Sequence, residues 1–378
     1  MKIKKRRESV YSSIDLGLNS ILTFATFVII QQNLGIDLVG YFGLVLSISA
    51  IGETIQQGLY ENPLFLNFGV GFKNFKLNIF NLALIVFIPL LAVDRFLLEG
   101  LIFPSFLYAV SHVLIHNIRI FDYKNNNVLI AAKRSIVISI LQVILFGYLL
   151  YNQNLITLEI IFYGIAVIRF SLIIINRSKI FFYSETIGND KNLSFLISSI
   201  LTIVRSRLPL WLLLPFGLGL VGIYETFRTL MEIYLTPSRP INLILLKNLK
   251  RDGSTNILKI GLLCGLLSSA GIAVTYFIIL NIGVYSLKEL DSIYPYLSLI
   301  LIIFCYWLSE VTGMIFQSNG YLDFEVMRRF SSLLIFALVG LILYKFLNFN
   351  LFLILVSSIY VFEVIFSLLN FKKLKLSE

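Results

Sequence analysis

Several arginine residues of this sequence lie inside long apolar stretches. Arg205 follows Ser198 and Thr202 at helical spacing in one stretch, and Arg228 follows Glu225 by three residues in the next. A guanidinium group can hold two phosphate oxygens at once. A charge at the centre of a bilayer costs about 2.5 to 3.5 kcal/mol on insertion scales, so these side chains should face protein, water or a bound anion. We therefore predict that Arg205, Arg228 and Thr202 line a cavity that binds a phosphate-bearing group.

Arg228 has a second interpretation that the sequence leaves open. Glu225 and Glu232 lie three and four residues from it, which is the spacing of an ion pair on one helix. Both glutamates are predicted to take part in such pairs in the cavity, and a purely structural role of Arg228 follows equally well. Arg205 has no acidic residue one turn away, so it is the stronger candidate for contacting phosphate.

Two polar stripes precede these residues in the chain. Residues of the first recur at spacings of 3, 4, 4 and 3, and residues of the second at 4, 4 and 3, which places each set on one helical face. The first stripe is Ser12, Asp15, Asn19, Thr23 and Thr26, and the second is Ser49, Glu53, Gln57 and Tyr60. We expect Asn19 to join the cavity lining. Asp15 and Glu53 are candidates for binding a coupling ion, either a proton or sodium.

The sequence offers no sign of a metal site, a cofactor or a catalytic centre. His112 and His116 are four residues apart, but "HVLIH" lacks the glutamate of a zinc protease and no third ligand is evident. We expect a structural role for both. No carboxylate pair or nucleophile constellation occurs in the longest outer connection, about a dozen residues near 288–291. The prediction is a protein that is not an enzyme.

The composition requires a membrane around these residues. Hydrophobic residues make up 58% of the chain, charged residues 14%, and the mean hydropathy is +0.87. A span needs about 20 mostly apolar residues. We predict an all-α polytopic membrane protein with about twelve transmembrane helices, near 10–31, 38–60, 77–98, 100–117, 134–151, 155–176, 193–216, 220–246, 256–281, 293–316, 328–346 and 349–370.

The basic residues predict the orientation. The N-terminal "MKIKKRR" and the C-terminal "FKKLKL" are both basic, which places both termini in the cytoplasm under the positive-inside rule and requires an even number of spans. Of 31 lysines and arginines, 22 fall in these tails and in inner connections, and 3 fall in outer connections. The inner set includes Arg119, Arg134, Arg328 and Arg329. Because the basic residues are dispersed over separate segments, the net charge of +10 predicts no nucleic-acid partner.

A short pattern repeats nearly half a chain apart. "LGIDLVGYFGLVLSI" at 34–48 matches "FGLGLVGIYETFRTL" at 216–230 when shifted by 182 residues, with Gly35 on Gly217 and Gly40 on Gly222. Two halves of six spans each insert with the same orientation, related by a pseudo-two-fold axis along the membrane normal. We predict an N-terminal six-helix bundle at 1–190 and a C-terminal six-helix bundle at 191–378.

Five segments together resemble bacterial O-antigen and capsular polysaccharide flippases, the Wzx-like branch of the multidrug/oligosaccharidyl-lipid/polysaccharide exporter superfamily. They are the basic N-terminal tail, "SIDLGLNS", "GIDLVGYFGLVLSI", "IRIFDYKNNNVLIAAKRS" and "GLGLVGIYETFRTLMEIYLTPSRPINLILL". The resemblance implies two helical lobes around a central cavity. It also implies alternating access and export of an undecaprenyl-diphosphate-linked oligosaccharide from the inner to the outer leaflet of the bacterial plasma membrane.

The implied partners are this lipid-linked oligosaccharide, membrane lipids and other proteins of polysaccharide or lipopolysaccharide assembly. Two alternatives stay open. A drug or metabolite antiporter of the same superfamily would share the fold and differ in cargo. A membrane enzyme such as a polymerase or ligase would need a large outer loop or an added domain, which the spacing of the predicted spans does not leave room for.

Overall fold

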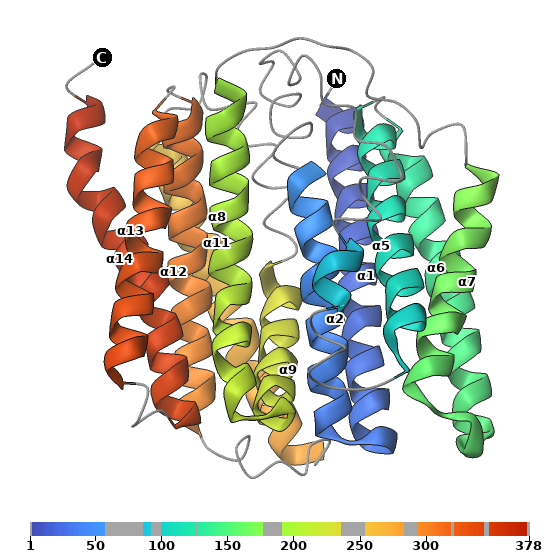
Figure 1. The fold of residues 1–378 in the computed structure, drawn as a ribbon. Coiled ribbons are helices and arrows are strands. Elements are labelled where there is room, and N and C mark those ends of the chain that lie inside the picture. The colour runs from blue at the N-terminus through green and yellow to red at the C-terminus, as the bar shows by residue number, and fades with distance from the viewer. Residues whose placement is uncertain are drawn as a thin grey trace. The chain divides into compact units, whose positions relative to one another are not determined.

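The computed structural model describes residues 2–56, 86–91, 100–124, 127–176, 191–235, 254–282, 293–318, 321–343 and 348–375. These residues form helices joined by short turns, and no strand occurs among them (Figure 1). The helices are α1 Lys2–Leu34, α2 Ile36–Gln56, α5 Ile102–Lys124, α6 Val128–Tyr151, α7 Leu158–Ile175, α8 Lys191–Leu213, α9 Leu218–Leu235, α11 Ser254–Ile282, α12 Ile293–Ser318, α13 Leu322–Leu343 and α14 Phe349–Lys375. Most of the span expected at 77–98 and the end of the one at 220–246 lie outside the described residues.

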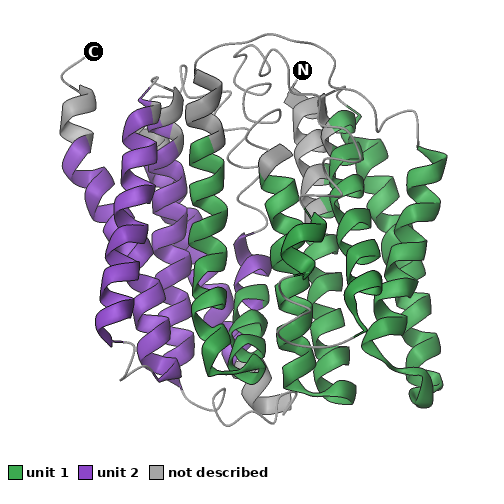
Figure 2. Cartoon of the chain, in the orientation of Figure 1, with its two compact units in different colours: residues 1–229 green, residues 230–378 purple. Residues whose placement is uncertain are grey.

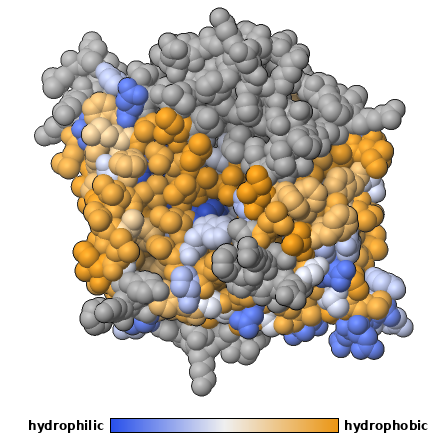
Figure 3. Space-filling view, viewed as in Figure 1, coloured by the Kyte–Doolittle hydropathy of each residue, from blue (hydrophilic) through white to orange (hydrophobic). Residues whose placement is uncertain are grey.

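Eight of the described helices are long and apolar enough to cross a membrane. Their outward faces carry large apolar side chains, and Figure 3 shows such residues covering most of the described surface on the face in view. Examples are Ile140, Val143 and Ile144 on α6, Val167 and Ile174 on α7, Leu262 and Leu266 on α11, and Leu341 and Ile342 on α13. A water-soluble protein rarely exposes such patches, so the class predicted from composition, an all-α polytopic membrane protein, is confirmed.

The chain divides into two compact units, residues 1–229 and 230–378 (Figure 2). In the first unit α1 packs against α6 and α2, and α5 packs between α2 and α7. In the second unit α12 packs against α11 and α14, and α14 packs against α13. Helix α8 packs against α2 and belongs to the first unit, and the unit boundary lies farther along the chain, within α9. The halves at 1–190 and 191–378 stay a prediction.

The two copies of the repeated pattern touch each other within the first unit. Gly35 and Gly217 both have positive φ, +96° and +111°, a conformation that favours glycine at the turn before α2 and before α9. A Cβ atom on Gly40 would overlap the carbonyl oxygen of Leu218 and lie 3.1 Å from the nitrogen of Gly222. A Cβ atom on Gly222 would overlap the carbonyl oxygen of Ile36 and lie 3.0 Å from the nitrogen of Gly40. Such reciprocal contacts are those of a local two-fold axis between α2 and α9.

Four arginines assigned to inner connections lie inside helices instead. Arg119 is in α5, Arg134 is in α6, and Arg328 and Arg329 are in α13, which begins at Leu322 and not near residue 328. All except Arg119 are buried. Each has a carboxylate partner within its own unit, and this neutralisation lets the helix continue through a charged position.

Candidate functional site

The arginines predicted to bind phosphate lie on α8 and α9. Arg205 and Glu225 are 1% and 0% exposed, and Arg228 is also buried. Arg228 donates from Nε to both carboxylate oxygens of Glu225 at 2.9 Å, and from Nη2 to Oε2 at 2.7 Å. Nη1 of Arg207 lies 3.6 Å from Oε1 of the same carboxylate. We call Arg207, Glu225 and Arg228 the α8–α9 charged group, and Arg205 is a further buried arginine of α8.

The structure therefore pairs Arg228 with Glu225, one of the two partners that the sequence left open. Glu225 fits there because Gly43 of α2 has no side chain: a Cβ atom at Gly43 would overlap Glu225 Cγ and lie 2.9 Å from its Cδ. Thr202 donates to the carbonyl oxygen of Ser198 at 2.7 Å, a bond within its own helix. Glu232 is half-buried farther along α9.

Asp15 and Asn19 of the polar stripe of α1 contact α5 and α6. Ser135 of α6 donates to Asp15, and Nε of Arg119 lies 3.3 Å from Asp15 Oδ2. Nδ2 of Asn19 donates to the Asp15 carbonyl oxygen at 2.7 Å and to Ser135 Oγ at 3.5 Å. The structure thus brings Asp15 and Asn19 together, and a guanidinium compensates the carboxylate of Asp15.

Glu53 of α2 faces the two histidines of α5. Oε1 of Glu53 lies 3.0 Å from Nε2 of His112 and 3.8 Å from Nδ1 of His116. The side chains of Glu53 and His112 are 16% and 25% exposed, whereas His116 is buried. Sequence reasoning placed Glu53 and the histidines separately, because nothing in the spacing along one helix shows which residues of another helix it meets.

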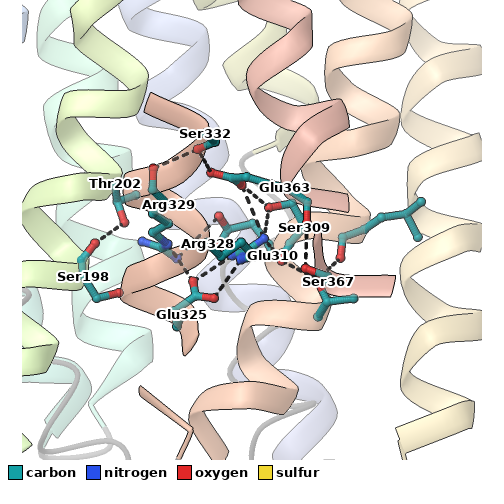
Figure 4. A network of polar contacts seen from close by, with 12 residues as sticks. Ser198, Thr202, Ser309, Glu310, Glu325, Arg328, Arg329, Ser332, Glu363 and Ser367 are labelled. Carbon is teal, nitrogen blue, oxygen red and sulfur yellow. Dashed lines mark hydrogen bonds and ion pairs between the residues drawn. The ribbon is translucent and has the colours of Figure 1, made fainter. Parts of the chain in front are cut away.

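A charged network in the second unit was missed by the sequence analysis (Figure 4). Arg328 donates from Nε and Nη2 to Glu325 at 2.9 and 2.8 Å, and its Nη1 lies 3.4 Å from Oε2 of Glu363 on α14. Arg329 donates to Glu325 at 2.6 Å. Ser309 of α12 accepts from Arg328 and donates to Glu363.

One signal in the sequence pointed to this network. Glu363 stands alone in the apolar run "VFEVIF", where an uncompensated carboxylate would be costly. Gly313 of α12 makes room for the network, because a Cβ atom there would lie 2.8 Å from Arg328 Nη2 and from Glu325 Oε1. The network joins α12, α13 and α14 through buried charges and hydrogen bonds. We interpret it as a structural clamp, that is, a set of polar contacts that holds these three helices together.

Among the residues described, no group of three or more His, Cys, Asp or Glu side chains could hold a metal ion. The α8–α9 charged group can do chemistry of another kind. Its two guanidinium groups and one carboxylate carry a net charge of +1, and buried positive charge attracts anions strongly because the local dielectric constant is low.

Comparison with known proteins shows the fold and no closer relationship. No family model matches the chain, and no curated protein matches it. The structure of the MATE multidrug transporter DinF-BH in complex with R6G has a TM-score of 0.65 at 13% identity, over 98% of this chain and 96% of that one. A MOP superfamily transporter from Pyrococcus furiosus has a TM-score of 0.60 at 11% identity, over 99% of this chain and 95% of that one.

An outward-facing multidrug resistance MATE family transporter of the MOP superfamily gives a TM-score of 0.59 at 14% identity, over 99% and 97% of the two chains. In each comparison nearly the whole of both chains is matched. This chain therefore has the fold of the MATE transporters of the MOP superfamily, with its two helical bundles.

Proposed function

We propose that this chain is a membrane transporter that works by alternating access. We further propose that its cargo is an undecaprenyl-diphosphate-linked oligosaccharide, an O-antigen or capsule repeat unit, moved from the inner to the outer leaflet. The fold shared with MATE transporters supports transport. The charge of the α8–α9 charged group carries the choice of cargo.

That group favours an anion over a cation. Its two guanidinium groups outnumber its one carboxylate, and Arg205 is a further buried guanidinium on α8. A diphosphate is attracted to such a group, whereas a cationic drug is repelled. Arginine suits the task because its planar fork matches phosphate oxygens. The lipid tail of the cargo can remain in the bilayer, so only the polar head needs this environment.

The contact between α2 and α9 suits a protein that alternates between states. Gly40 and Gly222 have no side chains, so the backbones of α2 and α9 meet directly at these two positions. Such a contact can separate without leaving an unpaired charge behind. We propose that it closes one side of the transport path and opens during the cycle.

The setting of this transporter follows from the same proposal. It would lie in the bacterial plasma membrane with both termini in the cytoplasm, and would work beside other proteins of polysaccharide assembly. The basic residues of the two tails support the orientation.

The test measures surface polysaccharide in a flippase-null strain, normalised to the amount of membrane-inserted protein. We expect Arg205→Ala to lower export per inserted molecule about ten- to a hundredfold, because a charge-assisted contact contributes about 1.5 to 3 kcal/mol. Arg205→Lys should recover only part of it, since lysine keeps the charge and loses the fork. Lys259→Ala removes an exposed basic residue of α11 and is the matched control. Normal export by Arg205→Ala would rule out this arginine as a cargo ligand.

Arg228 needs a different variant because it is bound to Glu225. Arg228→Ala would leave a buried carboxylate with one partner fewer and lower the amount of inserted protein. The double variant Glu225→Gln with Arg228→Gln removes both charges. We expect it to restore abundance, so that its export per molecule reports on Arg228 as a cargo ligand.

A drug or metabolite antiporter is the second candidate, and the multidrug transporters of the same fold favour it. It predicts that expression of the chain lowers the accumulation of cationic dyes in a host that lacks its own exporters. Dye efflux without rescue of surface polysaccharide would replace the flippase proposal with this one.

A further inference from the structure

We propose that Glu53, His112 and His116 form the binding site for a proton that drives the transport cycle. This inference rests on the proposed transport function and adds the coupling ion to it. It selects a proton over sodium and Glu53 over Asp15, and it gives the two histidines a functional role in place of the structural role expected from the sequence.

The geometry is that of a carboxylate–imidazole pair with a second imidazole beside it. His112 Nε2 lies 3.0 Å from Glu53 Oε1, within hydrogen-bond distance, and His116 Nδ1 lies 3.8 Å from the same oxygen. Both Glu53 and His112 are partly exposed, so a proton can reach them. The partners are imidazole nitrogens, whereas hard metal cations take several oxygen ligands. This chemistry suits a proton.

Glu53 differs from the buried carboxylates of the first unit in the kind of partner it has. Asp15 lies beside Arg119, Asp122 beside Arg134 and Glu225 beside Arg228. Arginine stays charged at every pH that a cell meets, so those pairs are permanent.

The nearest partners of Glu53 are His112 and His116. Histidine gains and loses its charge near neutral pH. Of these four carboxylates, Glu53 is therefore the one whose compensation changes when a proton binds.

The surrounding charges keep the proton exchangeable. Arg119 acts electrostatically on both Glu53 and His112. Arg169 of α7 lies over the Tyr108 ring, 4.6 Å from its centroid, and Tyr108 stacks on His112 at 6.2 Å between centroids. Both guanidinium groups repel the positive charge that His112 gains on protonation, and so they oppose the attraction of Glu53 for that charge. The other titratable or charged residues described in the first unit on α2, on α5 and on the helices that contact them are Tyr11, Asp15, Asp37, Tyr41, Asp122, Lys133, Arg134, Tyr148, Tyr151, Glu159, Tyr163, Arg205, Arg207, Tyr224, Glu225 and Arg228.

The proton step is simple. While the His112 ring is neutral, its Nε2–H donates to Oε1 of the ionised Glu53 carboxylate. A proton from water binds the lone pair of Nδ1, and the pair becomes imidazolium and carboxylate. This adds an ion pair between α2 and α5 close to Gly52, whose missing side chain lets α2 pack against Val113. Because α2 also carries Gly40, proton binding would bias the helix that makes the α2–α9 contact.

The chain has only two histidines, which makes the proton site directly observable. Full-length protein labelled with ¹⁵N-histidine gives two sets of imidazole signals, and His116→Asn identifies those of His112. We expect the His112 ring to become protonated between about pH 5 and 8. In Glu53→Gln the pH of half protonation should fall by about one unit or more, a tenfold loss of proton affinity. Glu159→Gln removes an exposed carboxylate of α7 and should leave it unchanged. An imidazole that stays neutral, or a midpoint that Glu53→Gln does not move, would overturn the proposal.

A second measurement tests whether the proton reaches the α2–α9 contact. Spin labels at Asn33→Cys and Phe216→Cys, both exposed positions, report the separation of the turns before α2 and α9 after Cys264 and Cys305 are replaced by alanine. We expect the distance distribution to change with pH at the His112 midpoint, and Glu53→Gln to abolish the change. A distribution independent of pH would refute coupling. Both measurements are made without cargo, so normal export by Arg205→Ala would overturn the cargo proposal and leave the proton site standing.

Discussion

Adding one methyl group at Gly40 should separate α2 from α9. A Cβ atom there would overlap the carbonyl oxygen of Leu218, and a Cβ atom on Gly222 would overlap that of Ile36. The overlapping atoms are backbone atoms, which cannot rotate away as a side chain can. The helices would have to move apart by about 1 Å, and overpacking of this kind costs about 1 to 3 kcal/mol.

That cost shifts the equilibrium between transport states by about 5- to 150-fold, away from the state in which the two helices touch. The spin labels at residues 33 and 216 measure this as a loss of the short-distance population. We expect Gly40→Ala and Gly222→Ala to have similar effects. The double variant should cost less than their sum, because the first methyl group already opens the shared contact.

Gly147 of α6 supplies the matched control, because a Cβ atom there would meet nothing within 4 Å. Gly147→Ala should leave the distances unchanged and stabilise the helix by about 0.5 to 1 kcal/mol. If Gly40→Ala gives the same distances and the same export as Gly147→Ala, the close contact of α2 with α9 plays no part in the cycle.

Two further expectations concern stability and orientation. Arg328→Met should lower the amount of inserted protein, because it leaves Glu325 and Glu363 buried with less compensation, at a cost of about 3 to 5 kcal/mol. Thermal unfolding of the purified protein checks this expectation. An unchanged unfolding midpoint would contradict the role of this network as a structural clamp. Alkaline phosphatase fused after Asn154 should be active and after Asn189 inactive, and activity at Asn189 would contradict the predicted twelve-span topology.

The fold class could be predicted because it depends on composition and on periodicity along single helices. Apolar runs of about 20 residues predicted the helices, and the spacing of Asp15 and Asn19 placed them on one face, where the structure finds them together. The glycine pattern predicted matching turns, and Gly35 and Gly217 indeed share a positive φ. None of these inferences needs to know which helix lies next to which.

Partners between helices could not be predicted for that reason. Glu53 and His112 are 59 residues apart, and their spacing carries no record of their contact. Arg328 was placed in a connection because a hydropathy window treats every charge as a cost. It does not register that Glu325 one turn earlier and Glu363 on α14 neutralise that charge. A search for carboxylates within one turn of each arginine would have assigned Arg328 and Arg329 to a helix.

These arginines also bear on the orientation, which stays a prediction. Four of the 22 basic residues counted on the inner side are arginines that pair with carboxylates inside helices, so they are weaker topology signals. Removing them leaves 18 on the inner side against 3 on the outer side. The positive-inside rule depends on basic residues that stay in water at the membrane surface. A buried arginine bound to a carboxylate does not follow that rule, because its position depends on how the helices pack. A carboxylate beside a histidine, as at Glu53 and His112, is instead the kind of pair for which we propose proton binding.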